Sequence, residues 1–157
     1  MNPLTRLAIA IGGMPWLPRY VKQIVWLDRG IHRLSRGRVT LLTVARLPQL
    51  YLTVRGRKSG QPRTTPLLYV PHHGAYLIAG SNWGAPKLPV WVLNLRHADT
   101  AKVDVKGRHT EVTTRQPEGE ERAQLWQVMI RTWPNYSKYA ERTDREIPIF
   151  VLTPVPG

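Results

Sequence analysis

The chain has 157 residues, of which 42% are hydrophobic, and this is enough for one domain with a hydrophobic core. It contains no cysteine, which excludes a disulfide framework and a thiolate metal site, and no apolar run reaches the roughly 18 residues that predict a transmembrane helix. The net charge of +13 is concentrated in residues 1–63, which hold 12 Lys/Arg and one acid, and such a field attracts nucleic acid, anionic lipid or a polyanionic ligand.

Residues 1–36 form a basic segment, and one amphipathic helix is predicted within it, over residues 19–35. Pro18 and Gly37 suit the positions just before its start and just after its end. Its apolar residues recur at spacings of four and three and so share one face: Tyr20, Ile24, Leu27, Ile31 and Leu34. Most of its cations lie off this face.

Two positions of this helix are compatible with its pattern. It can pack its apolar face on the rest of the domain. It can also lie on an anionic membrane surface, where Trp16, Trp26 and the flanking cations fit the interface. The sequence leaves both open, and a helix that swings could do both.

From Val39 onward the pattern is that of short strands separated by turns. Strands are predicted over residues 39–45, 49–54, 64–70, 75–80, 101–105, 110–113 and 147–152, and helices over 87–96, 117–132 and 135–142. Tight turns are predicted at His72-His73-Gly74 and at Gly107. We therefore expect an α+β fold that is mainly β, a small barrel with inserted and C-terminal short helices, over residues 37–157.

Several nucleotide and metal motifs are absent from the sequence. Neither G-x-G-x-x-G nor G-x-x-x-x-G-K-[ST] occurs, and the elements are not a βαβ series, so a Rossmann or P-loop site is not expected. There is no H-E-x-x-H, and the five histidines show no metal-ligand grouping, so no metal site is predicted.

The densest cluster of charge lies between two predicted strands, over Arg55–Arg63. It holds four cations, Ser59 and two glycines in nine residues. Glycines let backbone N–H groups converge on an anion, and Arg and Lys side chains bind phosphate. From this composition, a phosphate site and an exposed basic turn are about equally supported.

A second group of residues suggests a site for a flat ring. The predicted strand that ends at Ala79-Gly80 runs into small and polar residues, which let a ring lie against backbone, and Asn94 can bond a ring carbonyl. The alternative is structural, with Trp91 in the core and Asn94 as a cap or turn residue. The residues alone leave both open.

Several strings, taken together and in order, resemble one protein family. They are Gly56-Arg57-Lys58-Ser59-Gly60, Ser81-Asn82-Trp83-Gly84, Pro89-Val90-Trp91, Trp133-Pro134-Asn135-Tyr136-Ser137 and Thr143-Asp144-Arg145. Through them, most of residues 20–155 resembles the deazaflavin-dependent nitroreductases, which are actinobacterial, mainly mycobacterial, quinone reductases. The resemblance implies a split β-barrel of the FMN-binding type. It also implies reduced coenzyme F420, an 8-hydroxy-5-deazaflavin, as the cofactor.

The resemblance also assigns roles to residues at the matching positions. The phosphate and acidic tail of the cofactor would be held by Arg57, Lys58, Ser59 and Arg63. The cofactor side chain would run beside Thr64, Thr65, Pro66, Leu67 and Leu68. The ring would be lined by Ala79, Gly80, Ser81 and Asn82 and enclosed by Val90, Trp91, Val92, Leu93 and Asn94. Tyr136 would cover the ring, and Tyr139 would face the acceptor.

The reaction that the resemblance implies is hydride transfer from the reduced deazaflavin to a quinone-like acceptor of the menaquinone type, or to another hydrophobic acceptor. A quinone that takes a hydride also needs a proton, and Ser81, Tyr136 and Tyr139 are the candidates to donate it or to orient the acceptor. We expect a cytoplasmic monomer or homodimer, held peripherally on the inner face of the cell membrane by its basic helix.

Three positions depart from the family pattern. Leu68 and Trp133 stand where well-studied members have tyrosines, and Asn82 stands where a lysine is common. Leu68 and Trp133 belong to the expected acceptor-facing wall, so the range of acceptors is expected to differ. This applies to nitroaromatic compounds, which some relatives reduce as a side activity.

Two other classes of function compete with this one. A non-enzymatic nucleic-acid binder fits the net charge, but no helix-turn-helix or RNA-binding aromatic motif is present, so no nucleic-acid partner is expected. A barrel of the same fold could instead bind FMN, haem or a bilin, because ligands vary within a fold.

Overall fold

The structure is a computed structural model and describes residues 3–34 and 47–156. These residues form seven strands: β1 (Gln49–Arg55), β2 (Pro62–Leu68), β3 (Val70–His72), β4 (Ala75–Ala79), β5 (Thr100–Val105), β6 (Arg108–Arg115) and β7 (Ile149–Pro154). They pair antiparallel in one sheet, in the order β2-β1-β5-β6-β7-β4-β3. The helical elements are α1 (Pro3–Gly12), η1 (Leu17–Tyr20), α2 (Val21–Leu34), η2 (Asn82–Gly84), α4 (Val90–Leu95), α5 (Gly119–Thr132) and α6 (Asn135–Glu141).

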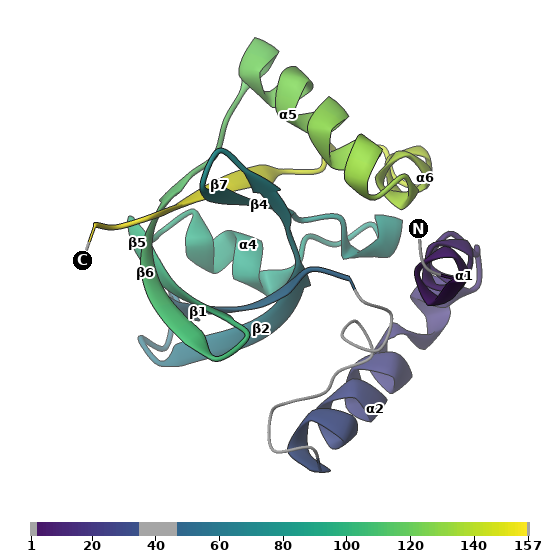
Figure 1. The fold of residues 1–157 in the computed structure, drawn as a ribbon, viewed down its shortest axis with the longest axis horizontal. Coiled ribbons are helices and arrows are strands. Elements are labelled where there is room, and N and C mark those ends of the chain that lie inside the picture. The colour runs from purple at the N-terminus through teal and green to yellow at the C-terminus, as the bar shows by residue number, and fades with distance from the viewer. Residues whose placement is uncertain (1–2, 35–46, 157) are drawn as a thin grey trace.

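The inner face of the sheet forms one core together with α4. Figure 1 shows the sheet curling around this helix, which confirms the predicted mainly β, split-barrel fold. Side chains alternate along a strand, so every second residue of a strand points inward. The inward residues include Leu50, Leu52 and Val54 of β1 and Phe150 and Leu152 of β7, and α4 fills the space between them with Trp91, Val92 and Leu95.

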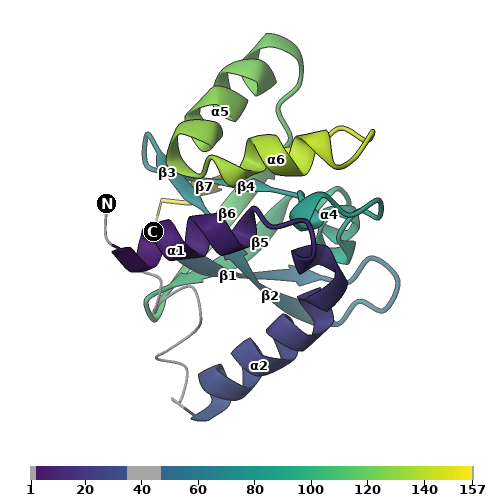
Figure 2. The same cartoon turned by 90° about the vertical axis from the view of Figure 1, so that its right-hand side faces the viewer.

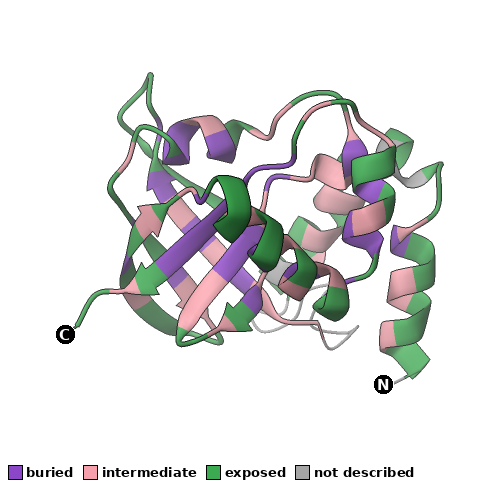
Figure 3. Cartoon of the chain, turned by 90° about the horizontal axis from the view of Figure 1, so that it is seen from above, coloured by how far each residue is buried: buried purple, intermediate pink, exposed green. Residues whose placement is uncertain are grey.

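The outer face of β4 and β7 forms a second core beneath α5 and α6. Figure 3 shows buried positions in these strands and in the helices that cover them. The outward side chains of the strands include Leu77, Ile149 and Val151, and the helical side contributes Leu125, Met129, Trp133, Tyr136 and Tyr139. The tyrosines predicted to act at the site therefore belong to this second core.

Most predicted elements from residue 49 onward are confirmed. Both hairpin turns have the expected left-handed backbone, with φ of +48° and +77° at His73 and Gly74, and +53° and +82° at Lys106 and Gly107. The strand predicted over 64–70 is wrong as a single strand. It divides into β2 and β3, because β2 pairs with β1 while β3 pairs with β4 at the opposite end of the sheet. The strand predicted over 39–45 lies outside the described residues.

The N-terminal segment contains two helices rather than one. α2 confirms the helix predicted over 19–35, whereas α1 was not predicted. Figure 2 shows α1 lying alongside α6, and Asn135 Nδ2 donates to the Ile9 carbonyl at 2.5 Å. Gly12 allows this approach, since a Cβ there would lie 2.9 Å from Asn135 Nδ2. Within the described ranges, no helix is long and apolar enough to cross a membrane.

Candidate functional site

A hollow of about 530 Å³ opens where the edge strand β2 meets α4. Arg63 and Thr65 pair with inward-facing residues of β1, so their side chains face the inside of the barrel at its open edge. The lining residues are Arg29, Gly56, Arg57, Lys58, Ser59, Pro62, Arg63, Thr64, Thr65, Val90, Trp91 and Asn94. Nine residues predicted to contact the cofactor are thereby brought together: Arg57, Lys58, Ser59, Arg63, Thr64, Thr65, Val90, Trp91 and Asn94.

The loop between β1 and β2 has the form of an anion-binding turn. Its base is closed by two backbone hydrogen bonds of 2.8 Å, from Gly56 N to Gln61 O and from Gly60 N to Gly56 O. Gly60 has a φ of +71°, which favours glycine at this position. In the described part of the chain, the backbone N–H groups of Lys58 and Ser59 make no hydrogen bond. They are therefore available to an anion, beside the basic side chains of the same loop.

Asn94 joins this loop to α4. Its Oδ1 atom accepts a hydrogen bond from the Arg57 backbone N at 3.1 Å and a longer one from Arg57 Nη1 at 3.4 Å. The side chain is only 4% exposed. Because its oxygen is engaged within the protein, the side-chain nitrogen is the atom that Asn94 can offer to a ligand. Asn94 is thus a structural link as well as a residue of the hollow.

Trp91 is both a core residue and a residue of the hollow, the two interpretations that the sequence left open. It is buried in the inner core, with its ring centroid 5.9 Å from that of Phe150, and it lines the hollow as well. The neighbouring Val90 is exposed and lines the same space, whereas Val92 is fully buried in the core. One helix therefore packs the barrel and forms a wall of the site.

The segment after β4 has an unusual backbone. Asn82 and Trp83 have φ values of +44° and +58° and are followed by Gly84 at +80°. A left-handed conformation at a non-glycine residue costs roughly 1 kcal/mol and persists only where surrounding contacts impose it. One such contact is the hydrogen bond from Asn82 Nδ2 to the Lys87 carbonyl at 3.0 Å.

Arg145 supplies the main brace for this segment. Its guanidinium donates to three backbone carbonyls, those of Gly80 at 3.0 Å, Ser81 at 2.9 Å and Ala85 at 3.1 Å. Burial lowers the pKa of Arg145 from its ordinary value. No role was predicted for Arg145 from the sequence. The available signal was its position in the string Thr143-Asp144-Arg145.

Of the four residues at the end of β4 that are expected beside the ring, three are half-buried and Gly80 is enclosed by packing. Ala79, Ser81 and Asn82 are half-buried around the end of β4. A Cβ at Gly80 would lie 2.6 Å from Val92 Cγ2 and 2.8 Å from Pro148 Cγ, so the small size of this residue is already required by packing. The further residues predicted along the cofactor, Pro66, Leu67, Leu68 and Leu93, are half-buried and do not line the hollow.

Tyr136 and Tyr139 are buried behind the sheet and do not line the hollow. The Tyr139 ring meets Trp83 of η2 edge-on, at 6.0 Å between centroids. Burial raises the pKa of Tyr139 to about 12, against smaller opposing effects of Trp133, Arg142 and Asn135, and burial also raises the pKa of Tyr136. Phenols with such pKa values keep their protons at neutral pH, so they suit hydrogen bonding better than proton release. Their predicted roles toward ring and acceptor stay predictions.

Comparison with known proteins identifies one family. Residues 28–154 match the family described as F420H(2)-dependent quinone reductase. An F420H(2)-dependent quinone reductase of Mycobacterium tuberculosis is 37% identical over 142 residues, which cover 88% of this chain and 95% of the relative. Among solved structures, an F420-H2 dependent reductase (FDR-A) is 36% identical with a TM-score of 0.62, covering 67% of this chain and 93% of its own. A domain-swapped dimer is 31% identical with a TM-score of 0.63, covering 82% and 97%.

Replacing Arg145 tests whether it braces the segment after β4. We expect Arg145→Ala to lower the free energy of unfolding by about 2–3 kcal/mol, because three part-buried carbonyls lose a charged donor. Arg145→Lys is expected to recover less than half of this, since an ammonium lacks the planar fork. Urea unfolding measures both variants against Arg131→Ala, which removes an exposed arginine of α5. A loss no larger than that of Arg131→Ala would contradict the bracing role.

Proposed function

Because the chain belongs to the F420H(2)-dependent quinone reductase family, we propose that the hollow between β2 and α4 holds the anionic tail of its cofactor. Membership makes the chain an enzyme with reduced coenzyme F420 as cofactor and a quinone as acceptor. It also removes the support for a non-enzymatic nucleic-acid binder.

The observation that carries this proposal is the chemistry of the hollow. Arg57, Lys58 and Arg63 line it, and among its described lining residues none is acidic. The tail of the cofactor carries phosphate and carboxylate groups, which suit Arg forks, a Lys ammonium and the N–H groups of Lys58 and Ser59. The residues present therefore fit the group that the family implies.

The other predicted residues are proposed to position the ring. When bound, the reduced deazaflavin supplies the hydride, while the protein provides binding, orientation and electrostatics. Val90 and Trp91 offer an apolar wall continuous with the hollow, and the Asn94 side-chain nitrogen can donate to a ring carbonyl. Ser81 is held by Arg145 at the end of β4, and it is the half-buried hydroxyl that we propose orients the acceptor.

We propose that the acceptor is a hydrophobic quinone of the menaquinone type. The three departures from the family pattern lie around the second core and the segment after β4. Trp133 is buried there and comes close to Gly12 of α1, since a Cβ on Gly12 would lie 3.2 Å from its ring. Leu68 packs against the same core. The α1 helix thus lies beside Trp133, one of the positions where this chain differs, and we propose that the choice between quinones and nitroaromatic acceptors is made there.

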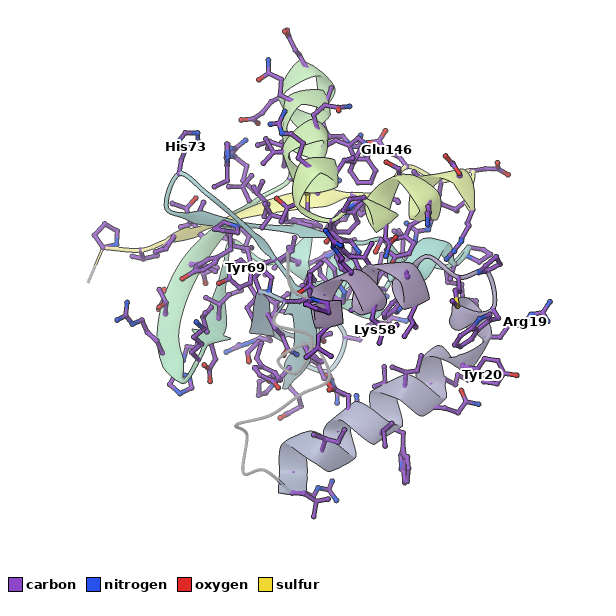
Figure 4. The ribbon with its side chains drawn as sticks, turned by 45° about the vertical axis from the view of Figure 1, so that its right-hand side comes forward. Arg19, Tyr20, Lys58, Tyr69, His73 and Glu146 are labelled. Atoms are coloured by element: carbon purple, nitrogen blue, oxygen red, sulfur yellow. The ribbon has the colours of Figure 1, made fainter. Side chains whose placement is uncertain are left out.

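We further propose that the N-terminal helices bind the inner face of the cell membrane. Most of the exposed large hydrophobic side chains of the described residues belong to this segment: Leu4, Leu7, Ile11, Met14, Trp16, Tyr20, Trp26, Leu27 and Leu34. Figure 4 shows Arg19 and Tyr20 projecting outward where the two helices meet. Exposed aromatic and cationic side chains on one helical segment are typical of an interfacial position. The enzyme would then meet a hydrophobic quinone at the membrane in which the quinone is dissolved.

Removing single cations of the loop tests the proposed tail site. We expect Lys58→Ala and Arg63→Ala each to weaken F420 binding about tenfold near 10 mM salt, and much less near 1 M, where the Debye length falls to about 3 Å. Quenching of tryptophan fluorescence measures the dissociation constants. Lys102→Ala removes an exposed charge from β5 and serves as the control.

Two results would contradict the tail site. One is F420 binding by Lys58→Ala and Arg63→Ala at low salt that equals that of Lys102→Ala. The other is tighter binding of FMN than of F420 by the unchanged protein, titrated side by side, which would favour a flavin barrel.

A charge placed on α2 tests the membrane proposal. Trp26 is 76% exposed, so Trp26→Glu is expected to leave the fold intact. It should weaken binding to vesicles that contain anionic phosphatidylglycerol about tenfold or more, because it removes an aromatic side chain that would enter the lipid interface and adds a negative charge that the vesicle repels. Flotation of the full chain measures the bound fraction, with Val155→Glu, at an exposed residue near the C-terminus, as control. Equal flotation of both variants and the unchanged protein would be incompatible with docking through α2.

A further inference from the structure

One cation of the hollow comes from outside the barrel. Arg57 and Lys58 belong to the loop and Arg63 to β2, whereas Arg29 reaches the same hollow from α2. In the described part of the chain, no salt bridge involves any of these four residues. Four positive side chains thus converge on one space, and none of the described residues that line it is acidic.

The described side chains of the α2 helix are at most half-buried. Ile24, Val25, Asp28 and Ile31 are half-buried, and a Cβ on Gly30 would have no neighbour within 4 Å. Its barrel-facing edge is marked by Asp28, whose charge contributes to raising the pKa of Tyr51 in β1, after the larger effect of burial. Arg29 follows Asp28 in the chain, and its exposed side chain lines the hollow.

Like charges that line one hollow repel, and here the repulsion acts between α2 and the barrel. An anion bound among the four side chains turns this repulsion into a net attraction between α2 and the barrel, because each cation is then attracted to the same group. We propose that Arg29 is a fourth ligand of the cofactor's anionic tail, and that the bound tail holds α2 against the barrel. This rests on the proposed function of the hollow and adds a residue and a coupling to it.

The coupling has a consequence for the reaction. The α2 helix carries Trp26 and Leu27 on its exposed surface, which is the surface proposed to meet the membrane. Fixing α2 through Arg29 would fix the orientation of the barrel relative to that surface. The tail of the cofactor then orients the enzyme on the membrane as well as anchoring the cofactor.

Binding measurements test the contact between Arg29 and the tail. We expect Arg29→Ala to weaken F420 binding roughly tenfold at low salt, the size of one charge-assisted hydrogen bond, and Arg29→Lys to recover part of the loss. Arg33→Ala is the matched control, because Arg33 lies one turn further along α2 and does not line the hollow. A deazaflavin without the phosphate tail should bind Arg29→Ala and the unchanged protein equally.

Hydrogen exchange of the α2 backbone tests the coupling without use of activity. Saturating F420 should slow exchange over residues 21–34 in the unchanged protein and in Arg33→Ala, and should fail to do so in Arg29→Ala, which still binds through the loop. Equal F420 affinity of Arg29→Ala and Arg33→Ala would overturn the inference, as would equal slowing of exchange in both. If Lys58→Ala and Arg63→Ala weaken binding while Arg29→Ala does not, this inference fails and the proposed tail site stands.

Discussion

The hydrogen bond from the Arg57 backbone to Asn94 Oδ1 connects the two halves of the site. Without it, the loop after β1 would be a basic turn at the edge of a sheet. With it, the loop is pinned to α4, whose position is set by the inner core through Trp91, Val92 and Leu95. The width of the hollow therefore follows from barrel packing, and Arg57 is held in place by a buried amide rather than by a partner of opposite charge.

Packing also determines the backbone of the proposed ring site at the end of β4. Gly80 is small because Val92 and Pro148 leave no room for a side chain, and the segment beyond it takes a left-handed path that Arg145 stabilises. These contacts join β4, α4 and the region before β7. The proposed ring site is thus built from segments distant in sequence, and its geometry depends on the core that they share.

Much of the barrel was predictable because its signals are local. Alternation along β1 and the glycine turns at residues 74 and 107 follow from strand and hairpin chemistry, and the ordered strings identified the family. The bracing by Arg145 and the proposed role of Arg29 were not predictable from periodicity, because each residue lies far away in the chain from the segments that it meets. The helix α1 was not predicted for a related reason: it contacts the side-chain amide of Asn135, which lies far away in the chain.

A crystal structure of the chain with F420 bound would show where the cofactor tail lies. We expect the tail phosphate within hydrogen-bonding distance of the backbone N–H groups of Lys58 and Ser59, with Arg57 and Arg63 around it. A phosphate bound elsewhere on the barrel, with the hollow between β2 and α4 free of the cofactor, would contradict it.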